Sequence, residues 1–269
     1  MMEPEYEFVC DNELNAQEQR AILAAAEQGD AEAQHRWGMH LFLQGDDECA
    51  LWLKKAAKQG HAGAMNDLGL MYMDGMVTRH DAKYGFMLFS GAAERGLVTA
   101  QYNLGLSYKA GDGVKRSKSK SFIWFSKAVA QGHPGALYEQ ACCYAQGFGV
   151  ERDVELANKL LRKAMVAGSG EAMYEVASLV LHDSESSEDE KTAAVKLVCK
   201  ATEYGSPAAM YFLARAYLDG TYGFPKDMEE SEYWLDQVLI SEPDAEDINI
   251  IPSSFIDREK LNESFRVRR

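Results

Sequence analysis

One six-residue phrase recurs along the chain at a nearly constant interval. It begins with glycine and carries alanine four residues later, as in GDAEAQ at Gly29 and GHPGAL at Gly132. Its six copies begin at Gly29, Gly60, Gly96, Gly132, Gly168 and Gly205, with intervals of 31, 36, 36, 36 and 37 residues. A period of this length is typical of a solenoid, in which each unit buries its apolar face against its neighbours. The period therefore predicts an array of repeats, whereas 269 residues alone would suggest one or two compact domains.

Small and apolar residues keep fixed positions around each phrase glycine. Alanine stands four residues before it and four after it in all six copies, and glycine or alanine stands nine residues after it. The apolar positions on both sides follow helical spacing. Each unit is therefore predicted to contain a first helix after the phrase, a glycine-bearing loop, and a second helix that the next phrase glycine closes. Asp30, Ser169 and Ser206 are suited to cap the first helices.

The most regular stretch resembles a known repeat. AQYNLGLSYKAGDGV from Ala100 to Val114, followed by WFSKAVAQGH from Trp124 to His133, is similar to the Sel-one-like repeat family, which is related to tetratricopeptide repeats. The resemblance covers roughly residues 16–242. It implies an all-α, right-handed superhelical solenoid of antiparallel helix pairs, with the first helices on the concave side. Repeat one departs from the pattern by being short, and repeat five has Asp183 in place of the loop glycine.

The same pattern predicts the domain organisation. Residues 1–29 form an N-terminal segment with a capping helix over 13–28, residues 30–242 form about six helix pairs, and residues 243–269 form a tail. A short helix is expected near residues 254–264. The apolar residues of the tail either fold back over the open end of the solenoid or attach to a partner.

The charge balance argues against nucleic acid as a partner. The chain has 28 Lys and Arg against 42 Asp and Glu, a net charge of −14, whereas sequence-independent nucleic-acid binding needs a basic face. The charge is uneven, because residues 115–120 carry four bases and the predicted loop 182–191 carries five acids. Such runs are either solvated or dock a charged partner.

Several absences indicate the compartment and limit the chemistry. The first ten residues lack a secretory signal, no stretch reaches the roughly 18 apolar residues of a membrane span, and the five cysteines are irregularly spaced. We therefore expect a cytoplasmic protein with reduced thiols. The six histidines show no metal-ligand spacing, no nucleophile motif is present, and the glycine loops follow helices. No catalytic residue, metal or cofactor is expected, and His61 and His133, directly after phrase glycines, are interpreted as turn residues.

One stripe of each first helix is predicted to face the groove. Positions 3, 6, 10 and 13 after the phrase glycine (+3, +6, +10 and +13) lie opposite the core positions at about 100° per residue. The candidate partner-binding residues on this stripe are Asn66, Tyr102, Tyr138, Tyr174, Tyr211 and Arg215. Tyrosine combines a large contact area with a hydroxyl, which suits an interface anchor. Alternatively, these tyrosine rings only pack against one another along the row of first helices.

These features predict a non-enzymatic adaptor that binds a protein or peptide in its concave groove. The main alternative is an immunity-type inhibitor of a bacterial toxin, a role that similar repeats take, and the acidic charge would steer it toward a basic toxin. A hydrolase activity is the third and least favoured hypothesis.

Overall fold

The computed structural model describes residues 15–75 and 79–241, and within these ranges the secondary structure is helical, with no strand. The helices are α1 (Ala16–Glu27), α2 (Ala31–Leu43), α3 (Cys49–Lys58), α4 (Ala62–Asp74), α5 (Ala82–Glu94), α6 (Val98–Ala110), α7 (Lys118–Ala130), α8 (Pro134–Gln146), α9 (Val154–Val166), α10 (Gly170–His182), α11 (Glu188–Glu203), α12 (Pro207–Asp219) and α13 (Met228–Ser241). The prediction of an all-α repeat fold is confirmed. No helix in this part of the chain is long and apolar enough to cross a membrane.

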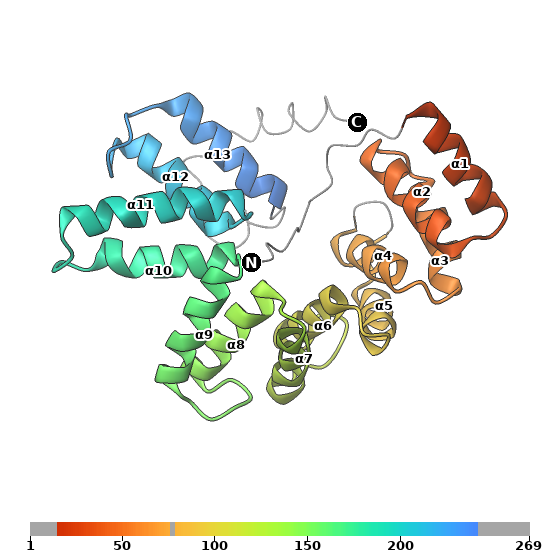
Figure 1. Cartoon of the computed structure of the whole chain (residues 1–269), viewed down its shortest axis with the longest axis horizontal. Helices are drawn as coiled ribbons and strands as arrows, with labels where there is room; N and C mark the ends of the chain where they lie inside the picture. Colours follow the sequence, from red (N-terminus) through yellow and green to blue (C-terminus); the bar gives the residue numbers. More distant parts are fainter. Residues whose placement is uncertain (1–14, 76–78, 242–269) are drawn as a thin grey trace, which may run out of the picture. The chain divides into compact units, whose positions relative to one another are not determined.

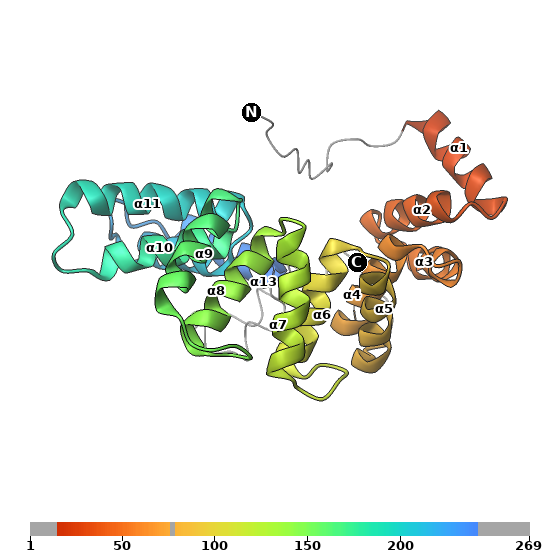
Figure 2. The same ribbon diagram turned by 60° about the horizontal axis from the view of Figure 1, so that its bottom comes forward.

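The helices alternate as the period predicts. Even-numbered helices are the first helices, which follow a phrase glycine, and odd-numbered helices from α3 onward are the second helices. The pairs α2–α3, α4–α5, α8–α9, α10–α11 and α12–α13 pack side by side and antiparallel (Figures 1 and 2). Second helices also pack against the next first helix, at α3–α4, α9–α10 and α11–α12. This is the packing of a solenoid, in which each pair covers its neighbours.

Each phrase glycine turns the chain from one repeat into the next. All six have a left-handed φ, between +76° and +97°. At Gly60 the glycine N–H donates to the carbonyl of Ala57, and the N–H of His61 donates to the carbonyl of Ala56. These two bonds form a Schellman motif, and the same pair recurs at the other five phrase glycines. The alanine four residues before each glycine therefore supplies an acceptor, and its small side chain fits the core.

The residue after the phrase glycine caps the next first helix in five of the six repeats. The predicted caps Asp30, Ser169 and Ser206 each accept a hydrogen bond from the backbone N–H three residues on. His61 Nδ1 accepts from the N–H of Ala64 at 3.0 Å, and His133 Nδ1 accepts from that of Ala136 at 3.1 Å. The interpretation of both histidines as turn residues is confirmed.

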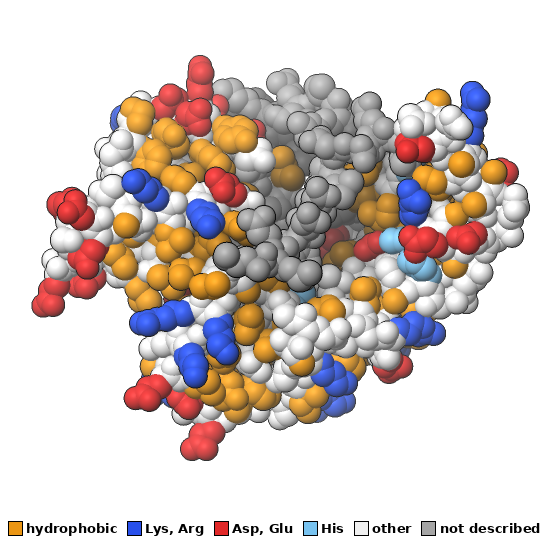
Figure 3. Space-filling view, viewed as in Figure 1, with side chains coloured by type: hydrophobic (Ala, Val, Ile, Leu, Met, Phe, Trp, Pro, Cys, Tyr) orange, Lys and Arg blue, Asp and Glu red, His pale blue; other side chains and the backbone are white. Residues whose placement is uncertain are grey.

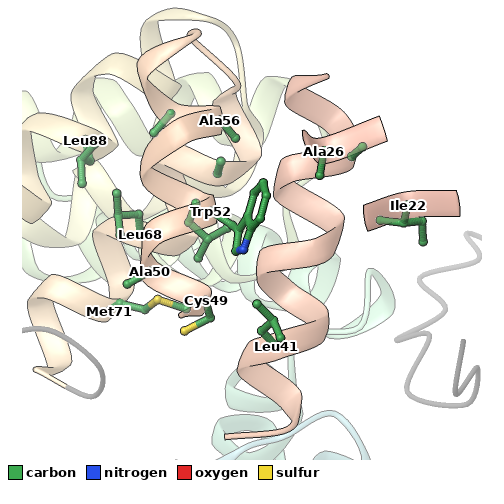
Figure 4. Packing of buried hydrophobic residues seen from close by; sticks show 14 residues of the cluster. Ile22, Ala26, Leu41, Cys49, Ala50, Trp52, Ala56, Leu68, Met71 and Leu88 are labelled. Atoms are coloured by element: carbon green, nitrogen blue, oxygen red, sulfur yellow. The ribbon is translucent and has the colours of Figure 1, made fainter. Parts of the chain in front are cut away.

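The chain divides into two compact units. Among the described residues, unit 1 comprises 15–107 and 111–115 without the gap at 76–78, and unit 2 comprises 108–110 and 116–241. In unit 1, the core residues Ile22, Leu41, Trp52 and Leu68 come from α1 to α4 (Figure 4). In unit 2, a core cluster is formed by side chains of α10, α11 and α12, such as that of Val198. The predicted limits of the solenoid at residues 30 and 242 remain a prediction.

The predicted capping helix is α1. The Asn15 side chain accepts hydrogen bonds from the N–H groups of Gln17 and Glu18, and the Glu18 carboxylate accepts one from the Asn15 N–H, which completes a capping box. Ile22 and Ala26 bury the inner face of α1. The tail and its expected helix at 254–264 lie outside the described residues.

The acidic run of repeat five is only partly a loop, which corrects the sequence-based expectation. Asp183 follows α10 with an extended backbone, so no left-handed glycine is required there. Glu188 and the two acids after it form the first turn of α11, where Ser187 and Glu190 make a capping box. Acidic side chains at a helix N-terminus are stabilised by the helix dipole, so these charges contribute to the helix itself.

Candidate protein-binding face on the first helices

The six candidate residues lie on first helices of both units. Asn66 on α4 and Tyr102 on α6 belong to unit 1. Tyr138 on α8, Tyr174 on α10, and Tyr211 and Arg215 on α12 belong to unit 2. Within unit 2, α10 contacts both α8 and α12, so the three tyrosines occupy equivalent positions on adjacent helices. Asn66 is buried, the tyrosines are half-buried and Arg215 is exposed.

Each candidate tyrosine of unit 2 lies beside the side chain four residues further along its own helix. These neighbours are Cys142 for Tyr138, Ser178 for Tyr174 and Arg215 for Tyr211. The predicted +6 and +10 columns therefore lie side by side on the helix surface. Burial raises the pKa of Tyr138 and, to a smaller extent, that of Tyr174, so both hydroxyls are neutral at physiological pH.

Residues at position +7 pair with +6 residues of the preceding repeat, which sequence reasoning missed. His35 Nε2 lies 2.6 Å from Asp67 Oδ2, and the Asn103 side chain donates to Asn66 Oδ1 at 3.0 Å. In unit 2, the ring centroids of Tyr174 and Phe212 are 6.3 Å apart. The +7 column is not conserved across the six repeats, so it is recognised only by its contacts with the +6 column. Its residues are Arg36, Asp67, Asn103, Glu139, Glu175 and Phe212.

An aromatic surface extends from α10 across α12 in unit 2. The ring of Phe212 contacts that of Tyr174 on one side and that of Tyr222 on the other, where the centroids are 4.9 Å apart. Tyr222 follows α12, has a left-handed φ of +56°, and is 45% exposed. Hydrophobic side chains gather over this part of unit 2 (Figure 3). At the edge of the surface, Arg215 pairs with Asp219 at 3.3 Å, an exposed ion pair of the kind that contributes little to stability.

A buried carboxylate lies near Tyr138 on α8. Glu139 on α8, with a side chain only 9% exposed, accepts from Lys109 Nζ at 2.6 and 2.9 Å. Burial raises the pKa of the neighbouring Cys142, and it raises that of Cys143 to about 12. Both thiols are therefore protonated at neutral pH, whereas a nucleophilic cysteine needs a lowered pKa.

In unit 1, the fold brings together a group of potential metal ligands that linear spacing did not reveal. One ligand atom of each of Glu32, His35 and His61 lies within 4.8 Å of those of the other two. Glu32 and His35 share α2, whereas His61 comes from the next repeat. The prediction of no metal site depends on the spacing of possible ligands along the sequence. Such spacing does not reveal ligands that come together only when one repeat packs on the next.

Comparison with protein families gives one match. The model of the Sel1 repeat matches residues 31–61, 62–97, 98–133, 134–165 and 207–237. These segments cover more than half of the chain. The unmatched interval contains repeat five, in which Asp183 replaces the loop glycine. No curated protein matches the chain.

Solved structures of similar fold come from several bacteria. A protective antigen of uropathogenic Escherichia coli with an SLR fold is 28% identical, with a TM-score of 0.58, over 82% of this chain and 48% of its own. A Sel1 repeat protein of Oxalobacter formigenes is 25% identical, with a TM-score of 0.62, over 84% of this chain and 66% of its own. An immunity protein of Pseudomonas aeruginosa is 20% identical, with a TM-score of 0.51, over 87% of this chain and 86% of its own. This chain thus spans about half of the first protein and about two thirds of the second.

Proposed function

This chain belongs to the Sel1 repeat family, whose members generally mediate protein–protein interaction, and we propose that it is a non-enzymatic adaptor. In this proposal, a partner protein or peptide lies across α8, α10 and α12 of unit 2. On unit 1, Tyr102 would contribute a corresponding contact, whereas Asn66 is buried and bonded to Asn103, so the sequence-based choice of Asn66 as a contact residue is not retained.

The observation that carries the proposal is the set of three half-buried tyrosines on adjacent first helices. The rings of Tyr138, Tyr174 and Tyr211 are restrained by half-burial and by the side chain four residues further along the same helix. Restrained rings lose little conformational freedom on binding, so more of their contact area contributes to affinity. Phe212 and Tyr222 extend the apolar area, and Arg215 adds a cation at its edge. A surface of this kind suits a partner with apolar anchors and an acidic group.

The test is partner binding by the full chain and by tyrosine variants. A partner is first captured by affinity purification and identified by mass spectrometry, and its Kd is then measured by isothermal titration calorimetry. We expect Tyr174→Ala with Tyr211→Ala to raise the Kd at least about tenfold, which corresponds to about 1.4 kcal/mol. Tyr174→Phe with Tyr211→Phe retains the rings and separates the hydroxyl contribution from loss of packing.

Tyr233→Ala is the matched control, because Tyr233 is 52% exposed on the second helix α13. It should bind the partner like the unchanged chain. Circular dichroism and thermal unfolding show whether each variant is folded. An unchanged Kd in the folded tyrosine-to-alanine variants would exclude this face as the binding site.

A second candidate function is toxin immunity. Two solved immunity proteins of Pseudomonas aeruginosa share the fold, with TM-scores of 0.51 and 0.53, and each is matched over at least 86% of its own length. The net charge of −14 would favour association with a basic toxin. Co-expression with a toxin encoded beside the gene tests this function: the chain should restore growth and bind the toxin in purified form. Continued growth arrest with the chain expressed would reject immunity for that toxin.

A further inference from the structure

Glu32, His35 and His61 converge on the first-helix face of unit 1, and we propose that they bind a Zn²⁺ ion. One ligand atom of each residue lies within 4.8 Å of the others. Histidine and acidic side chains lie side by side in the region of α2 and α4 (Figure 3). Two imidazoles and a carboxylate are a ligand set that Zn²⁺ uses in open sites, with a water molecule in the fourth position.

The two imidazole rings are already placed as neighbours. Their centroids are 4.6 Å apart, and His61 Nε2 lies 2.9 Å from Glu32 Oε2. Gly63 leaves the space that they occupy: a Cβ at this position would lie 3.1 Å from His35 Cε1 and 3.2 Å from His61 Cε1. Ligand atoms around a tetrahedral zinc ion are about 3.4 Å apart, so only small side-chain movements are required. The Glu32 side chain is 67% exposed and can make them.

A chain of polar contacts orients His35 for metal binding. His35 Nε2 donates to Asp67 Oδ2 at 2.6 Å, which leaves Nδ1 as the ligand atom. Asp67 Oδ1 accepts from Asn66, whose own Oδ1 accepts from Asn103. A carboxylate that accepts the second N–H of a histidine is the usual support of a metal ligand, because it fixes the ring and its tautomer. Asp67 is thus a positioning residue in the proposed site.

Zinc binding should change a hydrogen bond between His61 and the backbone. Its Nδ1 accepts from the N–H of Ala64, so in the neutral ring the proton is on Nε2, which donates to Glu32. Zinc at Nε2 requires this proton to move to Nδ1, and the hydrogen bond from Ala64 is then lost. Zinc should therefore change the environment of the Ala64 amide.

Repeat four provides an internal comparison. His133 stands at the same position as His61 and caps α8 through Ala136 in the same way. The preceding repeat, however, has Thr99 and Tyr102 where repeat one has Glu32 and His35. His133 therefore shares the capping role of His61 but lacks the two other ligands. Serine is a suitable replacement at both positions, because Ser169 and Ser206 cap α10 and α12.

The experiment is a calorimetric titration of the full, metal-free chain with Zn²⁺ at pH 7.5. We expect one ion per chain, with affinity lowered at least tenfold by His61→Ser and by His35→Ala, and unchanged by His133→Ser. Asp67→Asn should weaken binding about 10- to 100-fold, as for other groups that support a metal ligand. The NMR signal of the Ala64 amide should shift with zinc, whereas that of Ala136 should not.

Several results would overturn the proposal. These are no zinc binding at micromolar concentrations, equal binding by His61→Ser and the unchanged chain, or binding that is lost only when the cysteines are alkylated. Because serine retains the cap, a folded His61→Ser variant separates loss of the ligand from loss of the helix end. The site lies on unit 1, so the result is independent of partner binding by the tyrosine face of unit 2.

Discussion

At the scale of single residues, small side chains determine how closely the helices of a repeat approach. The glycine or alanine nine residues after the phrase glycine is buried in every repeat. A Cβ on Gly38 would lie 2.9 Å from Leu53 Cγ, and a Cβ on Gly69 would lie 2.7 Å from Phe89 Cε1. The sequence-based expectation of close approach at this position is confirmed in these two repeats, where the absence of a side chain admits the second helix.

Gly69→Ala should lower the free energy of unfolding by about 1–2 kcal/mol. Phe89 is only 2% exposed and cannot move aside, so the overpacking cost exceeds the gain in helix propensity. Gly91→Ala is the matched control, since its Cβ would meet the flexible thioether of Met65 at 3.3 Å. Denaturant unfolding measures both variants. Equal stability of the two would show that the close approach at Gly69 is not limiting.

At the scale of elements, the phrase that ends one helix also begins the next. The left-handed glycine ends the second helix of one repeat, and the side chain of the next residue caps the first helix of the following repeat. A histidine can serve as this cap only when its Nδ1 is unprotonated, because an imidazolium has no acceptor. Burial lowers the pKa of His133 below its ordinary value of 6.5, in agreement with a neutral cap.

The stability of the chain should accordingly depend on pH through His133. Because its pKa is lower in the folded state, the unfolded chain binds the proton more readily. The contribution is fully present above pH 6.5 and is lost as the pH falls from 6.5 toward the lowered folded-state pKa. Urea unfolding at pH 7.5 and 5.5 should show a smaller loss of stability in His133→Ser than in the unchanged chain. The same loss in both would exclude His133 as a contributor.

At the scale of the whole molecule, burial is organised by neighbouring repeats. The cluster around Leu53 and Leu68 belongs to unit 1, and the cluster around Val198 and Leu213 belongs to unit 2. In a repeat protein, stability is approximately a sum of repeat and interface contributions, so damage in one unit need not spread to the other.

Leu53→Ala should therefore destabilise unit 1 selectively, by about 2–5 kcal/mol. Leu53 has no exposed surface, whereas Leu51 on the same helix is 53% exposed, and Leu51→Ala is the control. Hydrogen exchange with mass spectrometry should show faster exchange in α2 to α4 and unchanged exchange in α10 to α12. A uniform increase along the chain would indicate that both units unfold as one.

The sequence by itself determined the repeat architecture, because each repeat depends on local interactions. One period of the sequence contains every local feature of the repeat: a left-handed glycine, a capping side chain three residues before its N–H partner, and alanines at helical spacing. The same period placed Tyr138, Tyr174 and Tyr211 at one position of successive first helices. Sequence patterning wrongly predicts a loop for the whole acidic run of repeat five, because a run of charges is typical of loops and the capping box between Ser187 and Glu190 lies within it.

Only the tertiary structure decided which side chains meet across repeats. The contacts of His35 with Asp67, of Asn66 with Asn103, and of Tyr174 with Phe212 join residues 32 to 38 positions apart, at offsets set by how one first helix packs on the next. The same packing brings Glu32 and His35 to His61. Helical periodicity fixes the direction of a side chain around its own axis, but it carries no information on the register between two helices.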